Sequence, residues 1–290
     1  MKILVIGGSG LLGNKLYQLL EESNYDVYST FYKNPNYAKN CFQLDITSKD
    51  QVNHVLNKVS PDVVVQTAAY TNVDDCERNR DRAYDINVMG TKNIAIAANK
   101  LSAKLVYIST DYVFDGKKGL YIEDDPLNPI NYYGLTKLEG EEIVKKICSN
   151  FIIARTSVIY GSNKINFVTW IIDQLKKGKQ IDIVTDQYVS PTLNIDLAEQ
   201  LLGLIEKDAR GVYHTAGGER ISRYDFSMAI ADVFDLDKDL INPAKMEDFN
   251  WPAKRPVDSS LDLSKISEIK KPCIVKEGVK MLQEDLGEWL

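Results

Sequence analysis

Histidine and cysteine, the residues most used to bind transition metals, are scarce in this sequence of 290 residues. The two histidines are His54 and His214, and the four cysteines are scattered without C-x-x-C spacing. Zinc sites and disulfide frameworks both depend on clusters of these residues. We therefore predict neither a zinc site nor a disulfide framework.

Long apolar runs and blocks of basic residues are also missing. No apolar run reaches the length of about 18 residues that suggests a bilayer span, and Met1-Lys2 leads directly into a short apolar run, so we expect no signal peptide. The net charge is −6 at pH 7, and no basic block could follow a phosphate backbone. We expect a cytoplasmic protein that binds neither membranes nor nucleic acids.

The first half of the sequence alternates apolar runs with helical patterns. Continuous apolar runs indicate strands that are buried on both faces, and regular alternation predicts an α/β fold with a doubly wound, Rossmann-type parallel sheet. The expected strands are at 3–6, 27–31, 63–67, 105–109 and 151–156, and the expected helices at 11–21, 48–59, 82–100 and 135–149.

After residue 161 the alternation loosens into short helical patterns at 167–177, 193–206, 222–234 and 276–286. We predict a dinucleotide-binding domain over residues 1–160 and a smaller C-terminal substrate-binding lobe over residues 161–290. Segment 186–210 is expected to return to the first domain.

A glycine-rich segment, Gly7-Gly-Ser-Gly10-Leu-Leu-Gly13, joins the first expected strand to the first expected helix. Its glycines suit a tight turn, a close approach of the backbone to a pyrophosphate, and close helix packing. The phosphates would lie at the helix N-terminus. The spacing departs from Gly-x-Gly-x-x-Gly, but its position between strand and helix favours a dinucleotide site over a plain turn.

The end of the second expected strand bears on the choice of cofactor. Ser29-Thr-Phe-Tyr-Lys33 contains no acid to hold a ribose 2′-hydroxyl, and Lys33 could meet a 2′-phosphate, so we predict NADP with NAD tolerated. Lys33 could equally be a solvated surface lysine. A further short strand is expected to end at Asp45, in Gln-Leu-Asp45-Ile46, and Asp45 could accept a hydrogen bond from the adenine amino group or simply begin a turn.

Tyr133 and Lys137 open a predicted helix and share one of its faces. The same spacing recurs at Tyr160 and Lys164, so spacing alone proves little. Tyr160, however, is expected where a strand passes into a loop, whereas Tyr133 follows a strand that ends in Ser109-Thr110-Asp111. We therefore predict that the first pair acts on the cofactor.

Hydride transfer to a carbonyl carbon creates an alkoxide, which needs a proton donor and a second hydrogen bond. Tyr133 suits the donor role if the charge of Lys137 lowers its pKa, and Lys137 can also bind the nicotinamide ribose. Thr110 or Ser109 would supply the second hydroxyl, and strand alternation points these two side chains to opposite faces. This chemistry needs no metal, and we expect none.

Further polar residues are candidates for contacts with the substrate. Asp111 and Tyr112 continue the same loop and could contact the substrate. Alternatively, Asp111 is a carboxylate that stabilises a turn and Tyr112 is an exposed aromatic residue. Asn87 could orient a water or a backbone carbonyl, or be an ordinary polar helix residue. Arg255, beside Lys254, suits a diphosphate because a guanidinium can bind two oxygens, and the alternative is a solvated charge pair.

Taken together, these motifs resemble the extended short-chain dehydrogenase/reductases and, within them, the dTDP-4-dehydrorhamnose reductases. The resemblance covers nearly the whole chain, and its Ser-Thr-Asp-Tyr-Val-Phe and Asp-Gln-Tyr motifs favour this family over the epimerases. The motifs that carry it are Gly7 to Gly13, Ala68 to Asp74, Ser109 to Phe114, Tyr133 to Glu141, Arg155 to Gly161, Asp186 to Thr192 and Arg255 to Ser260.

The resemblance implies NAD(P)H-dependent reduction of a nucleotide-linked 4-keto-6-deoxysugar, dTDP-4-dehydro-L-rhamnose to dTDP-L-rhamnose, with Thr110, Tyr133 and Lys137 as the triad. A homodimer is implied by analogy. Thr110 and Asp111 would contact the sugar nucleotide. The implied cofactor contacts are Gly10, Leu11, Leu12, Asp45, Ile46, Ala69, Tyr70, Thr71 and Ile108.

One departure leaves the exact sugar and nucleotide open. Val158 stands where family members often carry Trp, at a position that lines the sugar-nucleotide pocket. A sugar-nucleotide epimerase or dehydratase, which would retain NAD, is one alternative function. A non-catalytic, NADP-binding regulatory subunit is another, because fold does not fix function.

Overall fold

The computed structural model describes residues 1–35 and 39–287, and within them seven parallel strands form a central sheet in the order β11-β6-β5-β4-β1-β2-β3. The order reverses at β1, which creates a crevice at the carboxyl ends of β1 and β4. This confirms the Rossmann-type fold. The strands are β1 (Lys2–Ile6), β2 (Asp26–Phe31), β3 (Cys41–Gln43), β4 (Val63–Gln66), β5 (Lys104–Thr110), β6 (Phe151–Thr156) and β11 (Gly211–His214).

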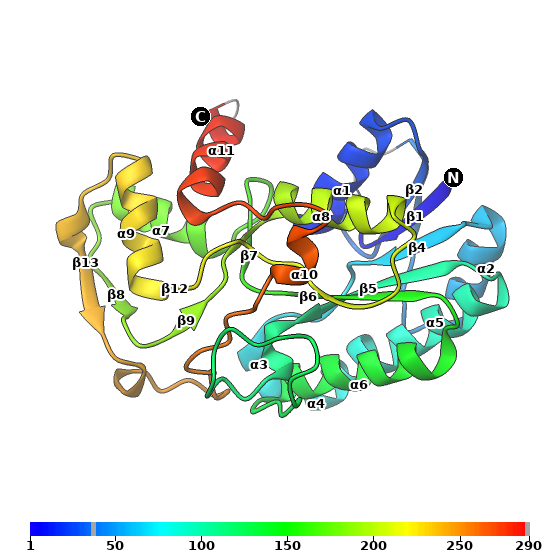
Figure 1. Cartoon of the computed structure of the whole chain (residues 1–290), viewed down its shortest axis with the longest axis horizontal. Helices are drawn as coiled ribbons and strands as arrows, with labels where there is room; N and C mark the ends of the chain where they lie inside the picture. The colour runs from blue at the N-terminus through cyan, green and yellow to red at the C-terminus, as the bar shows by residue number, and fades with distance from the viewer. Residues whose placement is uncertain (36–38, 288–290) are drawn as a thin grey trace.

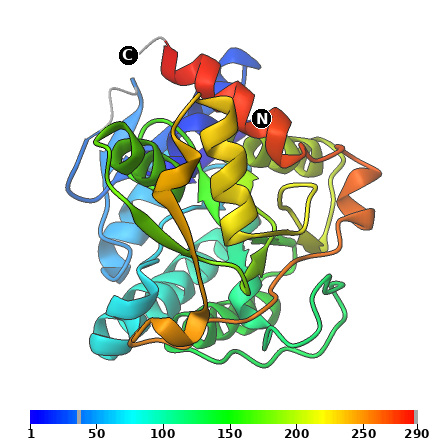
Figure 2. The ribbon, with the colours of Figure 1, turned by 90° about the vertical axis from the view of Figure 1, so that its left-hand side faces the viewer.

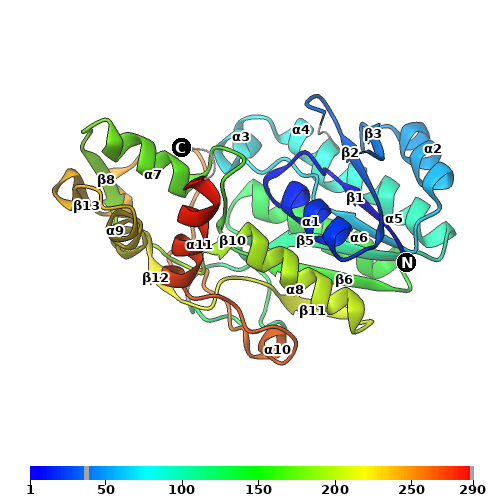
Figure 3. The same ribbon diagram turned by 90° about the horizontal axis from the view of Figure 1, so that it is seen from above.

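Helices cover both faces of the sheet (Figure 1). One face carries α1 (Leu11–Glu22) and α8 (Asn194–Glu206), which lie side by side in the view from above (Figure 3). The other face carries α2 (Lys49–Val59), α5 (Thr91–Lys100) and α6 (Tyr132–Ile147). Each layer packs its own apolar cluster against the sheet, which explains why the strand sequences are continuously apolar.

The helix predicted over 82–100 is interrupted by a π-helical turn. The short helix α4 (Arg80–Tyr84) passes into this turn, η1 (Asp85–Gly90), before α5 begins. A further short helix, α3 (Val73–Arg78), was not predicted and follows the cap residue Asn72. Single π-helical turns often occur at functional sites, and this one carries Asn87.

The smaller lobe, which faces the viewer in Figure 2, has a separate apolar core. It contains three helices that match the predicted patterns, α7 (Phe167–Lys176), α9 (Arg223–Val233) and α11 (Val275–Gly287), and the parallel strand pair β8 (Ile181–Val184) and β13 (Ile241–Ala244). Two-residue strand pairs lie between this core and the main sheet: β7 (Ile159–Tyr160) with β10 (Thr192–Leu193), and β9 (Tyr188–Val189) with β12 (Ile221–Ser222).

The chain returns to the main sheet after entering the smaller lobe. Helix α8 packs against α1, as expected of the predicted return segment 186–210. Strand β11, which follows this segment in the sequence, also returns and pairs with β6 at the edge of the sheet. The division of the chain at residue 160 stays a prediction. Within residues 1–35 and 39–287, no helix combines the length and the apolar character needed to cross a membrane.

Candidate active site

A cavity of about 910 Å³ lies at the carboxyl ends of the central strands. The loop after β1, the ends of β2, β4 and β5, and the first turns of α6 line it, and the smaller lobe contributes Arg223. A large concave site at the switch point of a doubly wound sheet is where such folds bind ligands.

The glycine-rich loop forms one wall of the cavity. Gly7 has a φ of +95°, and a Cβ there would lie 2.8 Å from the Ala68 backbone nitrogen. A Cβ on Gly13 would collide with the Gly7 carbonyl. The Gly7 N–H donates to Thr30 Oγ1 at 3.2 Å, and Gly10 is the N-cap of α1. Bare backbone at a helix N-terminus fits a pyrophosphate, so these residues suit a dinucleotide.

The wall formed by the ends of β2 and β3 differs from the sequence expectation in two respects. Strand β3 ends at Gln43, so the prediction that Asp45 ends this strand was wrong. The Asp45 carboxylate accepts hydrogen bonds from Thr47 N at 2.9 Å and Thr47 Oγ1 at 2.7 Å, yet it also lines the cavity. Lys33 does not line the cavity, and its ammonium lies 5.6 Å from the centroid of the exposed Tyr32 ring.

The loop after β4 passes along the cavity and is held by Asn87. Asn87 Oδ1 accepts from the Tyr70 N–H at 2.7 Å, and its Nδ2 donates to the Tyr70 carbonyl and to Thr136 Oγ1, both at 3.0 Å. The amide therefore fixes a backbone segment, one of the two roles considered for it. The predicted cofactor contacts that line the cavity are Gly7, Gly10, Leu11, Leu12, Gly13, Asp45, Ile46, Ala69, Tyr70, Thr71 and Ile108.

Thr110, Tyr133 and Lys137 all line this cavity. Thr110 is the last residue of β5, and α6 begins at Tyr132. The Thr110 hydroxyl donates to Asp111 Oδ1 at 3.0 Å and accepts from the Tyr112 N–H at 3.2 Å, and it lies close enough to the Tyr133 phenol to lower the pKa of Tyr133. Ser109 instead donates to Glu141 Oε1 at 2.6 Å. The two neighbouring hydroxyls therefore lie on opposite faces of β5, and Thr110 is the one beside the tyrosine.

The electrostatics of the pair differ from the sequence expectation. Burial raises the pKa of Tyr133, and this effect outweighs that of the nearby Thr110 hydroxyl, which lowers it. Lys137 is not among the main groups that act on Tyr133, so the expected lowering of the tyrosine pKa was wrong for the chain by itself. Burial lowers the pKa of Lys137 to about 7, while the Glu141 carboxylate raises it. Tyr133 therefore stays protonated at neutral pH, as a proton donor must.

Asp111 and Tyr112 are both buried, with exposed fractions of 2% and 8%. The alternative that Tyr112 is an exposed aromatic is therefore wrong. Asp111 Oδ2 accepts hydrogen bonds from Ser157 at 2.9 Å and Ser259 at 2.5 Å. Burial raises the Asp111 pKa, and the neighbouring hydroxyls lower it. The Tyr112 ring packs edge-on against Tyr133, with centroids 6.1 Å apart.

The smaller lobe contributes Lys164 and Arg223 to the cavity wall, and the predicted Arg255 is not among the lining residues. Arg255 pairs with Asp74 at 2.9 Å and does not line the cavity. Arg223, at the start of α9, does line it, and its charge lowers the pKa values of Asp111 and Tyr112. Sequence reasoning missed Arg223 because no motif surrounds it. Val158 lines the cavity with a φ of +42°, a conformation that β-branched residues rarely adopt.

The second Tyr-x-x-x-Lys pair is split between two environments. Tyr160 is buried in the core of the smaller lobe, with its ring centroid 5.5 Å from that of Phe226. Lys164 lines the cavity, whereas Tyr160 does not. Tyr160 is therefore a matched control for substitutions of Tyr133.

Comparison with known proteins identifies relatives of the whole chain. The family model described as RmlD substrate binding domain matches residues 1–286. A dTDP-4-dehydrorhamnose reductase of Aggregatibacter actinomycetemcomitans is 35% identical over 280 residues, which cover 92% of both chains. The solved structure of such a reductase from Clostridium acetobutylicum is 37% identical with a TM-score of 0.90, and it covers 99% of this chain and 100% of its own.

Two further relatives bear on the cofactor and on the alternative functions. The dTDP-4-dehydrorhamnose reductase of Bacillus anthracis, solved in complex with NADP, is 33% identical with a TM-score of 0.90 and covers 98% of this chain and 99% of its own. The methionine adenosyltransferase 2 subunit beta of Rattus norvegicus is 31% identical over 279 residues, which cover 92% of this chain and 82% of that protein. Similarity therefore extends both to named reductases and to a subunit of another enzyme.

Proposed function

The chain belongs to the dTDP-4-dehydrorhamnose reductase family of NAD(P)-dependent oxidoreductases, and from that premise we propose that it reduces dTDP-4-dehydro-L-rhamnose to dTDP-L-rhamnose with NADPH. The observation that carries the proposal is that Thr110, Tyr133 and Lys137 line one cavity together with the glycine-rich loop. A proton donor, a second hydroxyl and a cation thus face the place where a dinucleotide fits.

Tyr133, Thr110 and Lys137 have different roles in the proposed reaction. When bound, NADPH supplies the hydride that the carbonyl carbon of the sugar accepts. Tyr133 donates its phenolic proton to the carbonyl oxygen as negative charge develops there, which leaves a C–H and an O–H in the product. Thr110 would supply the second hydrogen bond to that oxygen, and the charge of Lys137 favours the phenolate that remains.

The same residues account for binding of the cofactor. The backbone of Gly7 and Gly10 at the start of α1 would hold the pyrophosphate. Lys137 would hold the nicotinamide ribose, and Asp45 would accept from the adenine amino group. NADP is the preferred cofactor, because β2 ends without an acid that would repel its 2′-phosphate, and NAD is tolerated.

On the substrate side, a nucleotide diphosphate requires a cation in the cavity. Arg223 meets this need better than Arg255, because Arg223 lines the cavity whereas Asp74 already pairs with Arg255. Asp111 and Tyr112 beside Arg223 would contact the sugar. Val158 lines the same wall.

The direct test is NADPH oxidation by the purified chain on addition of dTDP-4-dehydro-L-rhamnose, with identification of dTDP-L-rhamnose as the product. A panel of other keto-sugar nucleotides measured in parallel defines the sugar and the nucleotide. Failure of the whole panel to oxidise NADPH, with a folded chain that binds the cofactor, would contradict the proposed reaction.

A second candidate function rests on the similarity to methionine adenosyltransferase 2 subunit beta. A non-catalytic subunit would bind NADP but turn over no keto-sugar by itself. The presence of Thr110, Tyr133 and Lys137 in the cavity favours the reductase. An epimerase or dehydratase would instead retain NAD, which the ultraviolet absorbance of the purified protein would reveal, and would need no added reductant.

Location and assembly are the parts of the proposal that rest on family analogy. We place the protein in the cytoplasm and expect a homodimer. Cell fractionation tests the first expectation, and light scattering of the purified protein tests the second. A membrane-bound fraction or a monomer at working concentration would contradict them.

A further inference from the structure

Arg155 and Glu141 form a buried ion pair close to the residues of the triad. Arg155 Nε and Nη2 donate to Glu141 Oε1 and Oε2 at 3.0 and 2.8 Å. The side chains are 2% and 0% exposed. Burying two charges is unfavourable unless their geometry is good and the remaining polar atoms find partners, and such a pair is weak evidence for stability by itself. Its hydrogen bonds instead hold neighbouring segments in place.

Glu141 connects the two elements that carry the triad. Its Oε1 also accepts the Ser109 hydroxyl at 2.6 Å, and Ser109 precedes Thr110 at the end of β5. On α6, Glu141 lies one turn after Lys137, which lies one turn after Tyr133. One carboxylate thus joins the strand of the threonine to the helix of the tyrosine and lysine.

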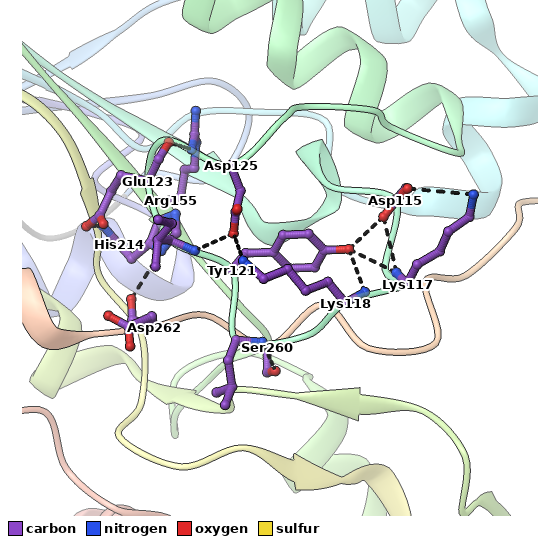
Figure 4. Close-up of polar contacts among 12 residues, drawn as sticks. Asp115, Lys117, Lys118, Tyr121, Glu123, Asp125, Arg155, His214, Ser260 and Asp262 are labelled. Atoms are coloured by element: carbon purple, nitrogen blue, oxygen red, sulfur yellow. Dashed lines mark hydrogen bonds and ion pairs between the residues drawn. The ribbon is translucent and has the colours of Figure 1, made fainter.

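Arg155 extends this connection to the loop between Thr110 and Tyr133. Its Nη1 donates to the Glu123 carbonyl at 2.9 Å. The Glu123 carboxylate accepts from the His214 backbone N–H at 2.9 Å. Figure 4 shows Glu123, Arg155 and His214 close together, beside the polar contacts around Tyr121. The ion pair is therefore also connected to the loop between Thr110 and Tyr133.

Glu141 is also the carboxylate that acts on Lys137. Lys137 faces the Tyr107 ring from β5, with its ammonium 4.0 Å from the ring centroid, and has Tyr133 and Glu141 one turn away on its own helix. Burial lowers the pKa of Lys137, and Glu141 raises it. The neighbouring positive groups bind Glu141 themselves: Arg155 as described, and Lys145 with its Nζ 3.8 Å from Oε2.

We propose that Glu141, fixed by Arg155, is a positioning residue that ties α6 to Ser109 at the end of β5 and so holds Tyr133 and Lys137 beside Thr110. Its charge, one turn from Lys137 on the same helix, also favours the protonated lysine. Glu141 does not line the cavity, so it acts through these neighbours and touches neither substrate nor cofactor. The inference rests on the proposed reductase function for its activity measurement. Its effect on Lys137 can be measured without any substrate.

The activity test is the pH dependence of kcat/KM for Glu141→Gln between about pH 6 and about pH 9. We expect the alkaline limb, where Lys137 loses its proton, to move to lower pH by about one unit or more, because an opposite charge nearby shifts a pKa by that amount. Glu142→Gln is the matched control. It removes the same charge at the next residue, which contacts Lys145 on the surface, and should leave the profile unchanged. An unmoved limb in Glu141→Gln would overturn the inference.

The second test is an NMR titration of the protein with isotope-labelled lysine. The Lys137 signal is identified by its loss in Lys137→Met, and its titration midpoint should fall in Glu141→Gln. An unchanged midpoint overturns the inference whether or not the chain reduces a keto-sugar. A lowered midpoint in a chain that reduces none of them would count against the proposed function alone and support the role of Glu141.

Loss of Glu141 leaves Arg155 buried without its partner, which can prevent folding. The double variant Glu141→Gln with Arg155→Gln removes both charges and avoids this state. Its Lys137 midpoint should again lie below that of the wild type, because Glu141 is the charged group that raises the Lys137 pKa. A midpoint equal to the wild-type value in a folded double variant would refute the proposal.

Discussion

The ammonium nitrogen of Lys137 lies 4.0 Å from the centroid of the Tyr107 ring on the neighbouring strand β5. The Tyr107 hydroxyl also donates to the Lys137 carbonyl at 3.3 Å, so strand and helix meet at the lysine itself. An aromatic face attracts a cation, but burial disfavours its charge, and the second effect prevails. The positive charge of Lys137 therefore serves the proposed reaction but lowers the stability of the folded chain.

Replacing Lys137 with Met should stabilise the cofactor-free protein while abolishing reduction. The folded pKa of about 7 lies below the value of about 10.4 expected in the unfolded chain. The cost of burying the charge is thus present below about pH 7 and is relieved as pH rises towards about 10. We expect the free energy of unfolding of Lys137→Met to exceed that of the wild type by about 1–2 kcal/mol near pH 6, with a smaller difference near pH 9. Urea denaturation at both pH values measures this, and a variant less stable than the wild type at pH 6 would contradict it.

Replacing Tyr133 with Phe should lower kcat/KM for keto-sugar reduction by at least about 100-fold, because the proton donor is lost. NADPH affinity should change little. Tyr160→Phe removes the same hydroxyl from a buried tyrosine outside the cavity and should retain activity. Steady-state kinetics of the two variants test the assignment, and equal losses in both would refute it.

Replacing Arg223 with Gln should raise KM for the nucleotide sugar by about 10-fold or more, since a charge-assisted hydrogen bond contributes about 1.5–3 kcal/mol. The KM for NADPH should stay close to the wild-type value. Arg255→Gln serves as the comparison, because Arg255 pairs with Asp74 outside the cavity. A larger effect at Arg255 than at Arg223 would restore the assignment that the sequence suggested.

Replacing Gly13 with Ala should weaken NADPH binding and destabilise the fold by about 1–3 kcal/mol, because the new methyl group would collide with the Gly7 carbonyl. Fluorescence titration with NADPH and thermal unfolding measure the two effects. Gly287→Ala is the control, since its Cβ would meet no heavy atom within 4 Å. Wild-type affinity in Gly13→Ala would show that the loop does not hold the cofactor as proposed.

Several parts of the site could be predicted because they depend on short stretches of chain. The glycine-rich loop follows an apolar strand and precedes a helix, and this order already indicates a helix N-terminus open to phosphate. Tyr133 and Lys137 share a helix face because side chains four residues apart are neighbours. The opposite orientations of Ser109 and Thr110 follow from strand alternation.

Other parts depended on contacts between distant segments. The sequence offered Arg255 for the diphosphate, but Asp74 of α3 pairs with it, and Arg223 lines the cavity instead. Tyr112 was open to an exposed position, yet packing against Tyr133 buries it. The local sequence around a cationic residue does not predict whether that residue forms an ion pair with a distant part of the chain.

The sequence by itself determined the doubly wound sheet, the dinucleotide loop and the Tyr133–Lys137 pair, because periodicity and turn chemistry act over a few residues. Only the tertiary structure decided the charge states around that pair. Burial in the folded chain raises the Tyr133 pKa and lowers that of Lys137, while Glu141 opposes the second shift. A pKa depends on desolvation and on charges brought near by folding, and neither can be read from the order of residues alone.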